Sequence, residues 1–201
     1  MISINLPFRR AIPDDAKDLA EFVNMASEGL ALYLWEEMAD AGASAWEVGC
    51  ARAKRDSGAF SYRNAILRLV GNDAVACLIG YPLDDDPPTT DYSDIPPMFV
   101  PLQKLEDMVP GTWYINVVAT REEHRGNGYG NELLALAENI ATSLGKRGLS
   151  LIVADTNVGA RRLYTSIGYR ELAQRTMVKE RWAHPGKNWV LMAKNIGAEA
   201  A

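Results

Sequence analysis

A glycine-rich segment carries the strongest chemical signal in the sequence. Its residues are Arg125, Gly126, Asn127, Gly128, Tyr129 and Gly130. Glycines leave backbone N–H groups accessible, because no side chain covers them. A run at 113–119 that is rich in β-branched and aromatic residues precedes the segment and predicts a buried strand. Apolar residues at helical spacing follow the segment, so the unpaired N–H groups of a helix start adjoin the loop. Oriented donors of this kind attract phosphate, so the segment predicts a phosphate or pyrophosphate site.

Two common phosphate-binding motifs fit the segment poorly. A Walker loop ends in Gly-Lys-Ser/Thr, whereas Gly130 is followed by Asn131 and Glu132. A dinucleotide fingerprint reads G-x-G-x-x-G near the start of a βαβ unit, whereas this loop reads G-x-G-x-G in the second half of the chain. The remaining pattern is R-x-x-G-x-G.

A second block of residues follows one predicted strand later. Residues 149–154 read as a buried strand, and the good N-cap residues of 155–157 follow it. A short helix is then predicted through Tyr164, with Gly168 suited to its C-terminal cap. Tyr164 offers a phenol with an ordinary pKa of about 10, which is protonated at neutral pH and can act as a proton donor.

The two blocks together resemble the GCN5-related N-acetyltransferases (GNAT). The resemblance covers roughly residues 7–194, is weakest before residue 60 and is absent from 82–112. It implies a mixed, mostly antiparallel sheet with helices on both faces, which makes the fold class α/β (α+β). It also implies an N-acetyltransferase that uses acetyl-CoA as co-substrate.

The resemblance assigns roles to individual residues. Residues 125–130 bind the pyrophosphate, Asn157 contacts the pantetheine amides as well as capping its helix, and Tyr164 is the general acid. Backbone groups at the end of the preceding strand face the pantetheine arm and the thioester carbonyl. These belong to Val118, Ala119 and Thr120.

The expected reaction is direct transfer to a primary amine in a ternary complex, because no Cys or Ser lies in a nucleophile-activating pattern. No general base is evident: the strand at 149–153 has no carboxylate, and Tyr114 and Asn116 occupy another position where the family has a Glu. Water or an acid of the segment 82–112 remains open, and so does a non-catalytic acyl-CoA-binding or sensing module of the same fold.

The segment 82–112 is too long for a simple hairpin connection and is interpreted as an ordered insertion containing a helix near 102–108. We expect it to line the acceptor site, since loops on a rigid scaffold commonly carry specificity. A surface flap or dimer contact is the alternative. The residues expected to contact the acceptor are Tyr92, Asp94 and Phe99.

Bulk properties fit one domain spanning residues 1–201. The formal net charge of −5 argues against a nucleic-acid partner. The sequence contains no run of 18 apolar residues, so a membrane partner is not expected. No leader pattern is seen at the N-terminus, so a cytoplasmic protein is expected. The isolated His124 and His184 predict no metal site, and a homodimer is possible.

The sequence also predicts the other secondary-structure elements of the domain, which must position the candidate site residues. They are a strand at 8–12, a helix from residue 13 to Gly29, a helix at 45–56, a hairpin of strands 61–70 and 74–81, final strands at 171–178 and 188–195, and a frayed tail at 197–201.

Overall fold

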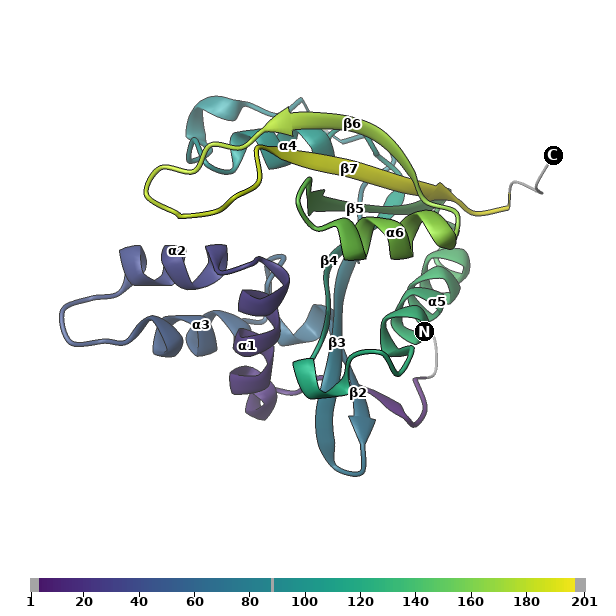
Figure 1. The fold of residues 1–201 in the computed structure, drawn as a ribbon, viewed down its shortest axis with the longest axis horizontal. Helices are drawn as coiled ribbons and strands as arrows, with labels where there is room; N and C mark the ends of the chain where they lie inside the picture. The colour runs from purple at the N-terminus through teal and green to yellow at the C-terminus, as the bar shows by residue number, and fades with distance from the viewer. Residues whose placement is uncertain (1–3, 88, 198–201) are drawn as a thin grey trace. The chain divides into compact units, whose positions relative to one another are not determined.

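A computed structural model describes residues 4–87 and 89–197 (Figure 1). Its strands are β1 (Phe8–Arg10), β2 (Ala65–Val70), β3 (Asp73–Pro82), β4 (Thr112–Thr120), β5 (Gly148–Ala154), β6 (Arg170–Thr176) and β7 (Asn188–Asn195). Its α-helices are α1 (Ala16–Ala26), α2 (Leu30–Met38), α3 (Ala45–Ala53), α4 (Val100–Glu106), α5 (Tyr129–Ser143) and α6 (Val158–Ser166). The strand order is β1-β2-β3-β4-β5-β7-β6. β4 and β5 run parallel, whereas β1–β2, β2–β3, β5–β7 and β6–β7 are antiparallel, which confirms the predicted mixed sheet.

Contacts group the chain into two compact units, neither of which is a continuous segment. The first contains residues up to Tyr81 and Asn116–Leu136, and the second contains Pro82–Ile115 and the residues from Ala137 onward. β4 and α5 each belong partly to one unit and partly to the other.

The core of the first unit lies where α1, α2 and α3 pack together and against the strands. The buried face of α1 includes Leu19 and Phe22, both fully buried. Side chains alternate along β4, so Val117 and Ala119 join this core while Asn116 on the other face is exposed. The core thus fixes the strand that leads to the glycine segment.

The second unit contains the N-terminal part of β4 and strands β5, β7 and β6, which lie side by side (Figure 1). Helix α4 packs against β5, β6 and β7. Gly148 is required at the start of β5, because a Cβ atom there would lie 2.5 Å from the Lys194 carbonyl oxygen. The buried hydroxyls of Thr112 and Ser150 are 2.7 Å apart and tie β4 to β5.

Helix α2 is absent from our sequence prediction. The first helix ends at Ala26 rather than at Gly29, and Gly29, with φ +89°, lies directly before α2. The first six residues of α2 are all apolar or aromatic, so they lack the polar face that signals a surface helix. Leu30, Ala31 and Trp35 are buried, in agreement with that composition.

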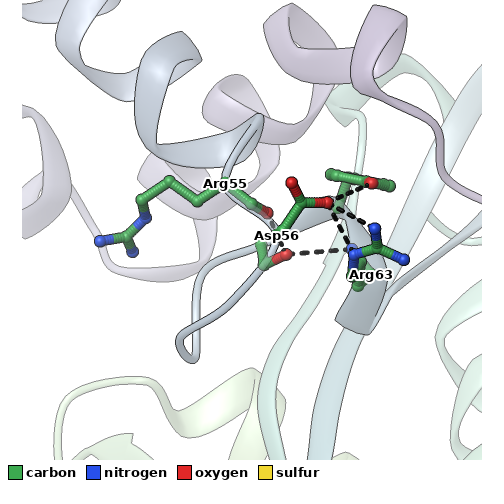
Figure 2. Close-up of polar contacts among 5 residues, drawn as sticks. Arg55, Asp56 and Arg63 are labelled. Carbon is green, nitrogen blue, oxygen red and sulfur yellow. Dashed lines mark hydrogen bonds and ion pairs between the residues drawn. The ribbon is translucent and has the colours of Figure 1, made fainter.

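The prediction that a strand begins at residue 61 is wrong, since Tyr62–Asn64 form a 3₁₀ turn and β2 begins at Ala65. The Ser61 hydroxyl donates to the Arg55 carbonyl at 2.5 Å and accepts from the Arg63 amide at 3.2 Å. Figure 2 shows Asp56 and Arg63 pointing toward one another, and the Tyr62 hydroxyl also donates to Asp56 at 2.8 Å. These local bonds compete with strand pairing.

Helix boundaries differ from the predictions by a few residues elsewhere. Helix α3 ends at Ala53 rather than Asp56, and α4 covers Val100–Glu106 rather than 102–108. Pro101 lies in the first turn of α4, where its missing N–H costs no helical hydrogen bond. The predicted tail lies almost wholly outside the described residues.

Candidate active site

The glycine segment connects β4 to α5 as predicted. A 3₁₀ turn (Glu122–His124) follows β4, and α5 begins at Tyr129. Gly126 and Gly128 have φ values of +80° and +81°, in the left-handed region that side chains disfavour. The Asn127 side chain donates to the His124 carbonyl at 3.0 Å and braces the turn. Glycine is therefore required by the backbone at two positions of this loop.

The loop presents unpaired backbone donors. Among the described residues, none accepts a hydrogen bond from the amides of Gly126, Asn127 or Gly128, and the first amides of α5 have no partner within their helix. Gly126 and Gly128 are exposed, and a Cβ atom at either would meet no atom within 4 Å. Alternating left-handed residues with open amides form a concave donor group, which binds anions.

Side chains around this loop occupy different environments. Arg125 is exposed, and its Nε lies 3.4 Å from the Thr120 carbonyl oxygen. Val118 and Thr120 are half-buried, whereas Ala119 is buried in the core. Tyr129 and Gly130 are half-buried in the first turn of α5. The exposed guanidinium of Arg125 is thus the cation of the predicted motif that solvent and an anion can reach.

Arg121 fixes the start of the loop, a role that the sequence analysis missed. Its guanidinium donates to Asp18 at 2.6 Å and Glu21 at 2.8 Å on α1, and to the Ala74 carbonyl at 2.9 Å. Its amide donates to the Val75 carbonyl at 2.9 Å. The partners on α1 are about 100 residues away in sequence, so no local pattern signals the network.

Asn157 in the second unit caps α6, as predicted. Its Oδ1 accepts a hydrogen bond from the Ala160 amide at 3.2 Å. The neighbouring Asp155 accepts from the amides of Lys187 and Asn188, with a shortest distance of 2.9 Å. Burial raises the pKa of Asp155, but these hydrogen bonds outweigh it and leave the pKa below its usual value. Asp155 therefore remains ionised and fixes the chain before the cap.

Tyr164 lies in the last turn of α6 and is 9% exposed. Burial raises its pKa to about 12, so the phenol stays protonated at neutral pH. Among the described residues, no hydrogen-bond partner of its hydroxyl is found, and its ring centroid lies 5.7 Å from that of Tyr169. Gly168 has φ +96° and ends the helix, as predicted, while the Tyr169 amide donates to the Tyr164 carbonyl at 3.0 Å. Tyr164 is thus a buried phenol that is neutral at pH 7.

The predicted acceptor residues lie in and beside two short elements of the insertion. The Tyr92 hydroxyl donates to Asp107 at 2.7 Å, and this bond raises the pKa of Tyr92. Asp94 is exposed, and Phe99 is half-buried directly before α4. Tyr92 thus has a structural partner on the α4 side of the insertion, whereas Asp94 faces solvent.

The candidates for a general base are the acids of the segment 82–112 and Tyr114, and their hydrogen bonds, ion pairs and burial can be compared. Asp91 accepts from the Ser93 amide at 2.9 Å, and Asp85 lies 3.4 Å from the Lys146 ammonium. Burial raises the pKa of Tyr114, which excludes it as a base at neutral pH. Among the described residues, no group of three His, Cys, Asp or Glu is suited to a metal ion.

A sequence profile of the acetyltransferase (GNAT) family matches residues 31–169, which is more than half of the chain. The chain belongs to the GNAT family. Within the matched range lie the glycine loop, Asn157, Tyr164 and the segment between β3 and β4 of this GNAT protein. Comparison with curated protein sequences gives no significant match.

Solved structures share the GNAT fold of this chain. One is described as an acetyltransferase and is 21% identical, with a TM-score of 0.64, covering 94% of this chain and 98% of its own. An N-acetyltransferase from Staphylococcus aureus Mu50 is 17% identical, with a TM-score of 0.62, covering 92% and 98%. A GNAT acetyltransferase from Elizabethkingia anophelis with acetyl-CoA bound is 18% identical, with a TM-score of 0.50, covering 66% and 75%.

In the described part of the chain, no helix is long and apolar enough to cross a membrane.

Proposed function

We propose that this GNAT protein transfers an acetyl group from acetyl-CoA to a primary amine by direct transfer in a ternary complex. The open amides of the glycine loop are the observation that carries the proposal, because donors of this kind attract phosphate and the loop carries the family's pyrophosphate motif. The acetyl-CoA bound to the Elizabethkingia anophelis relative supports the choice of donor.

In this proposal, the loop amides and the exposed Arg125 bind the pyrophosphate. The backbone of Val118, Ala119 and Thr120 contacts the pantetheine arm, and its donors stabilise the oxyanion that develops on the thioester carbonyl. Asn157 accepts a hydrogen bond from its own helix at Oδ1, and in this proposal its side chain also contacts pantetheine. Each role tests separately by substitution.

Tyr164 donates a hydrogen bond to the departing thiolate. With a pKa of about 12, full proton transfer to a thiolate whose thiol has a pKa of about 8.5 is uphill by roughly 5 kcal/mol. A hydrogen bond needs no such transfer and still stabilises the developing charge. Desolvation of the thiolate raises the pKa of its thiol toward that of Tyr164. The smaller difference between the two pKa values makes proton transfer less unfavourable.

The acceptor amine must lose a proton, since an alkylamine with a pKa of about 10.4 is mostly protonated at neutral pH. We propose that water takes this proton, because the acids of the insertion are exposed or engaged in local bonds. The same observation favours the second candidate function, a non-catalytic acyl-CoA-binding or sensing module. The two candidates agree on binding and differ on turnover.

We also propose that the insertion contributes to acceptor binding through Tyr92, Asp94 and Phe99. Replacing each by Ala in turn then raises the KM for the acceptor and leaves the KM for acetyl-CoA nearly unchanged. Tyr92→Phe is the matched control, since it retains the ring and loses only the bond to Asp107. If all three Ala variants keep wild-type acceptor kinetics, the acceptor site lies elsewhere.

The deciding experiment measures CoA and acetyl-CoA affinity by calorimetry and then follows thiol release with a panel of primary amines. Binding with amine-dependent thiol release supports the transferase. Binding without release from any amine supports the sensing module. Absence of binding overturns both candidates.

A further inference from the structure

Arg68 on β2 contacts the first turn of α5 through several groups. Its guanidinium carbon lies 3.7 Å from the centre of the Tyr129 ring, within the range of a cation–π contact. Its Nε donates to the Glu132 carboxylate at 3.1 Å, and its Nη1 donates to the Leu69 carbonyl at 2.8 Å. A single guanidinium thus joins the β2 backbone to two side chains of the helix start.

The strand and the helix both explain why these groups meet. Side chains alternate along β2, so the fully buried Leu67 enters the core with α1 and Arg68 projects from the other face. Tyr129 and Glu132 are three positions apart on α5, and therefore lie on one face of the helix. The Arg68 side chain is only 13% exposed, so water competes weakly for its contacts.

We infer that Arg68 is a positioning residue that holds the end of the glycine loop in its anion-binding form. Arg121 already fixes the start of the loop through Asp18 and Glu21. Arg68 fixes its end through Tyr129 and Glu132. The loop amides have no partners of their own among the described residues, so the two attachments set the directions in which these donors point. This inference rests on the proposed function, because it concerns the affinity of the same loop for CoA.

Charge alone does not account for Arg68. Its guanidinium is paired with Glu132, so the pair adds little net charge at the loop. Its planar group stacks on a ring and binds a carboxylate at once, and a lysine ammonium reproduces neither geometry. Its effect on CoA is therefore one of geometry.

The test replaces Arg68 by Met and measures the Kd for CoA by calorimetry. Arg10→Met is the matched control, since Arg10 is exposed on β1 and loses the same charge. We expect the Kd for CoA to rise about tenfold in Arg68→Met, the scale of one partly desolvated cation–π contact, and to change less than about twofold in the control. The Kd for pantetheine, which has no phosphate, stays at the wild-type value.

Three further variants separate positioning from its alternatives. Glu132→Gln in the Arg68→Met background leaves the affinity low, because the stacking is still lost; recovery to wild type would mean that an unpaired carboxylate had caused the loss. Arg68→Lys restores CoA affinity only partly. Tyr129→Leu weakens CoA binding to a similar degree, and combining it with Arg68→Met adds little.

The inference is overturned if Arg68→Met binds CoA as the wild type does, if it loses pantetheine affinity equally, or if Arg68→Lys restores binding in full. Should Arg68→Met fail to fold, Arg68→Lys and Tyr129→Leu decide the same question. Wild-type protein that binds no CoA overturns the proposed function, and the inference with it, whereas wild-type affinity with an insensitive Arg68 overturns the inference alone.

Discussion

Helices α5 and α6 each follow a strand of the sheet, yet their first turns are arranged differently. Asn157 closes the start of α6 by accepting a hydrogen bond from the Ala160 amide. The start of α5 follows a loop with glycines at 126 and 128, and among the described residues no side chain accepts from its first amides. Both helices begin with unpaired N–H groups, and in α6 the helix's own cap residue accepts from one of them. The comparison predicts which helix binds phosphate.

The largest expected effect comes from blocking the open start of α5. Gly128→Val places a branched side chain among the open amides of the glycine loop, and valine disfavours the φ of +81° found at this position. We therefore expect the Kd for CoA to rise at least about 100-fold. Calorimetry measures the loss.

Gly145→Val is the matched control, since Gly145 also has a positive φ of +66° and open space around its Cβ position. Both variants lose about 1–2 kcal/mol of stability from backbone strain. A folded Gly128→Val variant with wild-type CoA affinity would remove α5 from the site.

The second prediction concerns the Tyr164 hydroxyl, which is the group that α6 contributes to the proposed reaction. Tyr164→Phe lowers kcat by about 10², the scale for removing one hydrogen-bond donor from a developing charge, and leaves the Kd for CoA unchanged. Steady-state kinetics with an identified amine and calorimetry with CoA give the two values.

Tyr169→Phe is the control for this change, because the buried Tyr169 hydroxyl has no hydrogen-bond partner in the described part of the chain and its loss costs little. The pKa of about 12 also predicts that Tyr164 stays protonated as pH rises from 7 to 10. An alkaline fall in kcat near pH 10 that disappears in Tyr164→Phe would contradict this assignment.

The third prediction removes the closed start of α6. Asn157→Ala lowers the free energy of unfolding by about 1 kcal/mol through loss of the cap, whereas Asn157→Asp keeps it. Thermal unfolding of the pair measures the cap. If Asn157 also contacts pantetheine, both variants weaken CoA binding; equal CoA affinity in all three proteins would limit Asn157 to its helix.

The smallest effect is expected at Arg125, the exposed side chain at the glycine loop. Arg125→Ala raises the Kd for CoA by only about threefold, because an exposed charge pair is screened by solvent and the backbone donors remain. The difference from wild type shrinks as salt is added. A loss as large as that of Gly128→Val would assign the pyrophosphate to the side chain rather than to the amides.

Local sequence signals predicted the elements that carry the candidate site. The glycines of the loop, the Asn157 cap and the Gly168 helix end are each determined by neighbouring residues, and each lies where it was predicted. Helix α2 escaped prediction because its apolar composition is set by burial and gives no amphipathic period.

Long-range contacts set the remainder of the site. Arg68 and Glu132 are 64 residues apart, and Arg121 and Asp18 are 103 apart, so neither attachment of the loop has a signature in the sequence. The prediction of a strand at Tyr62–Asn64 failed for a different reason. The Ser61 hydroxyl and Asp56 form local hydrogen bonds there, and these compete with strand pairing.

The helix end at Gly168 gives the protein a natural reporter of its own motion. The amide proton of Tyr169 is held by the Tyr164 carbonyl, so it exchanges with solvent only when the last turn of α6 opens. Its exchange rate therefore records how often Tyr164 leaves its fixed position. One backbone resonance, followed with and without CoA, would report the equilibrium between the ordered and the opened turn.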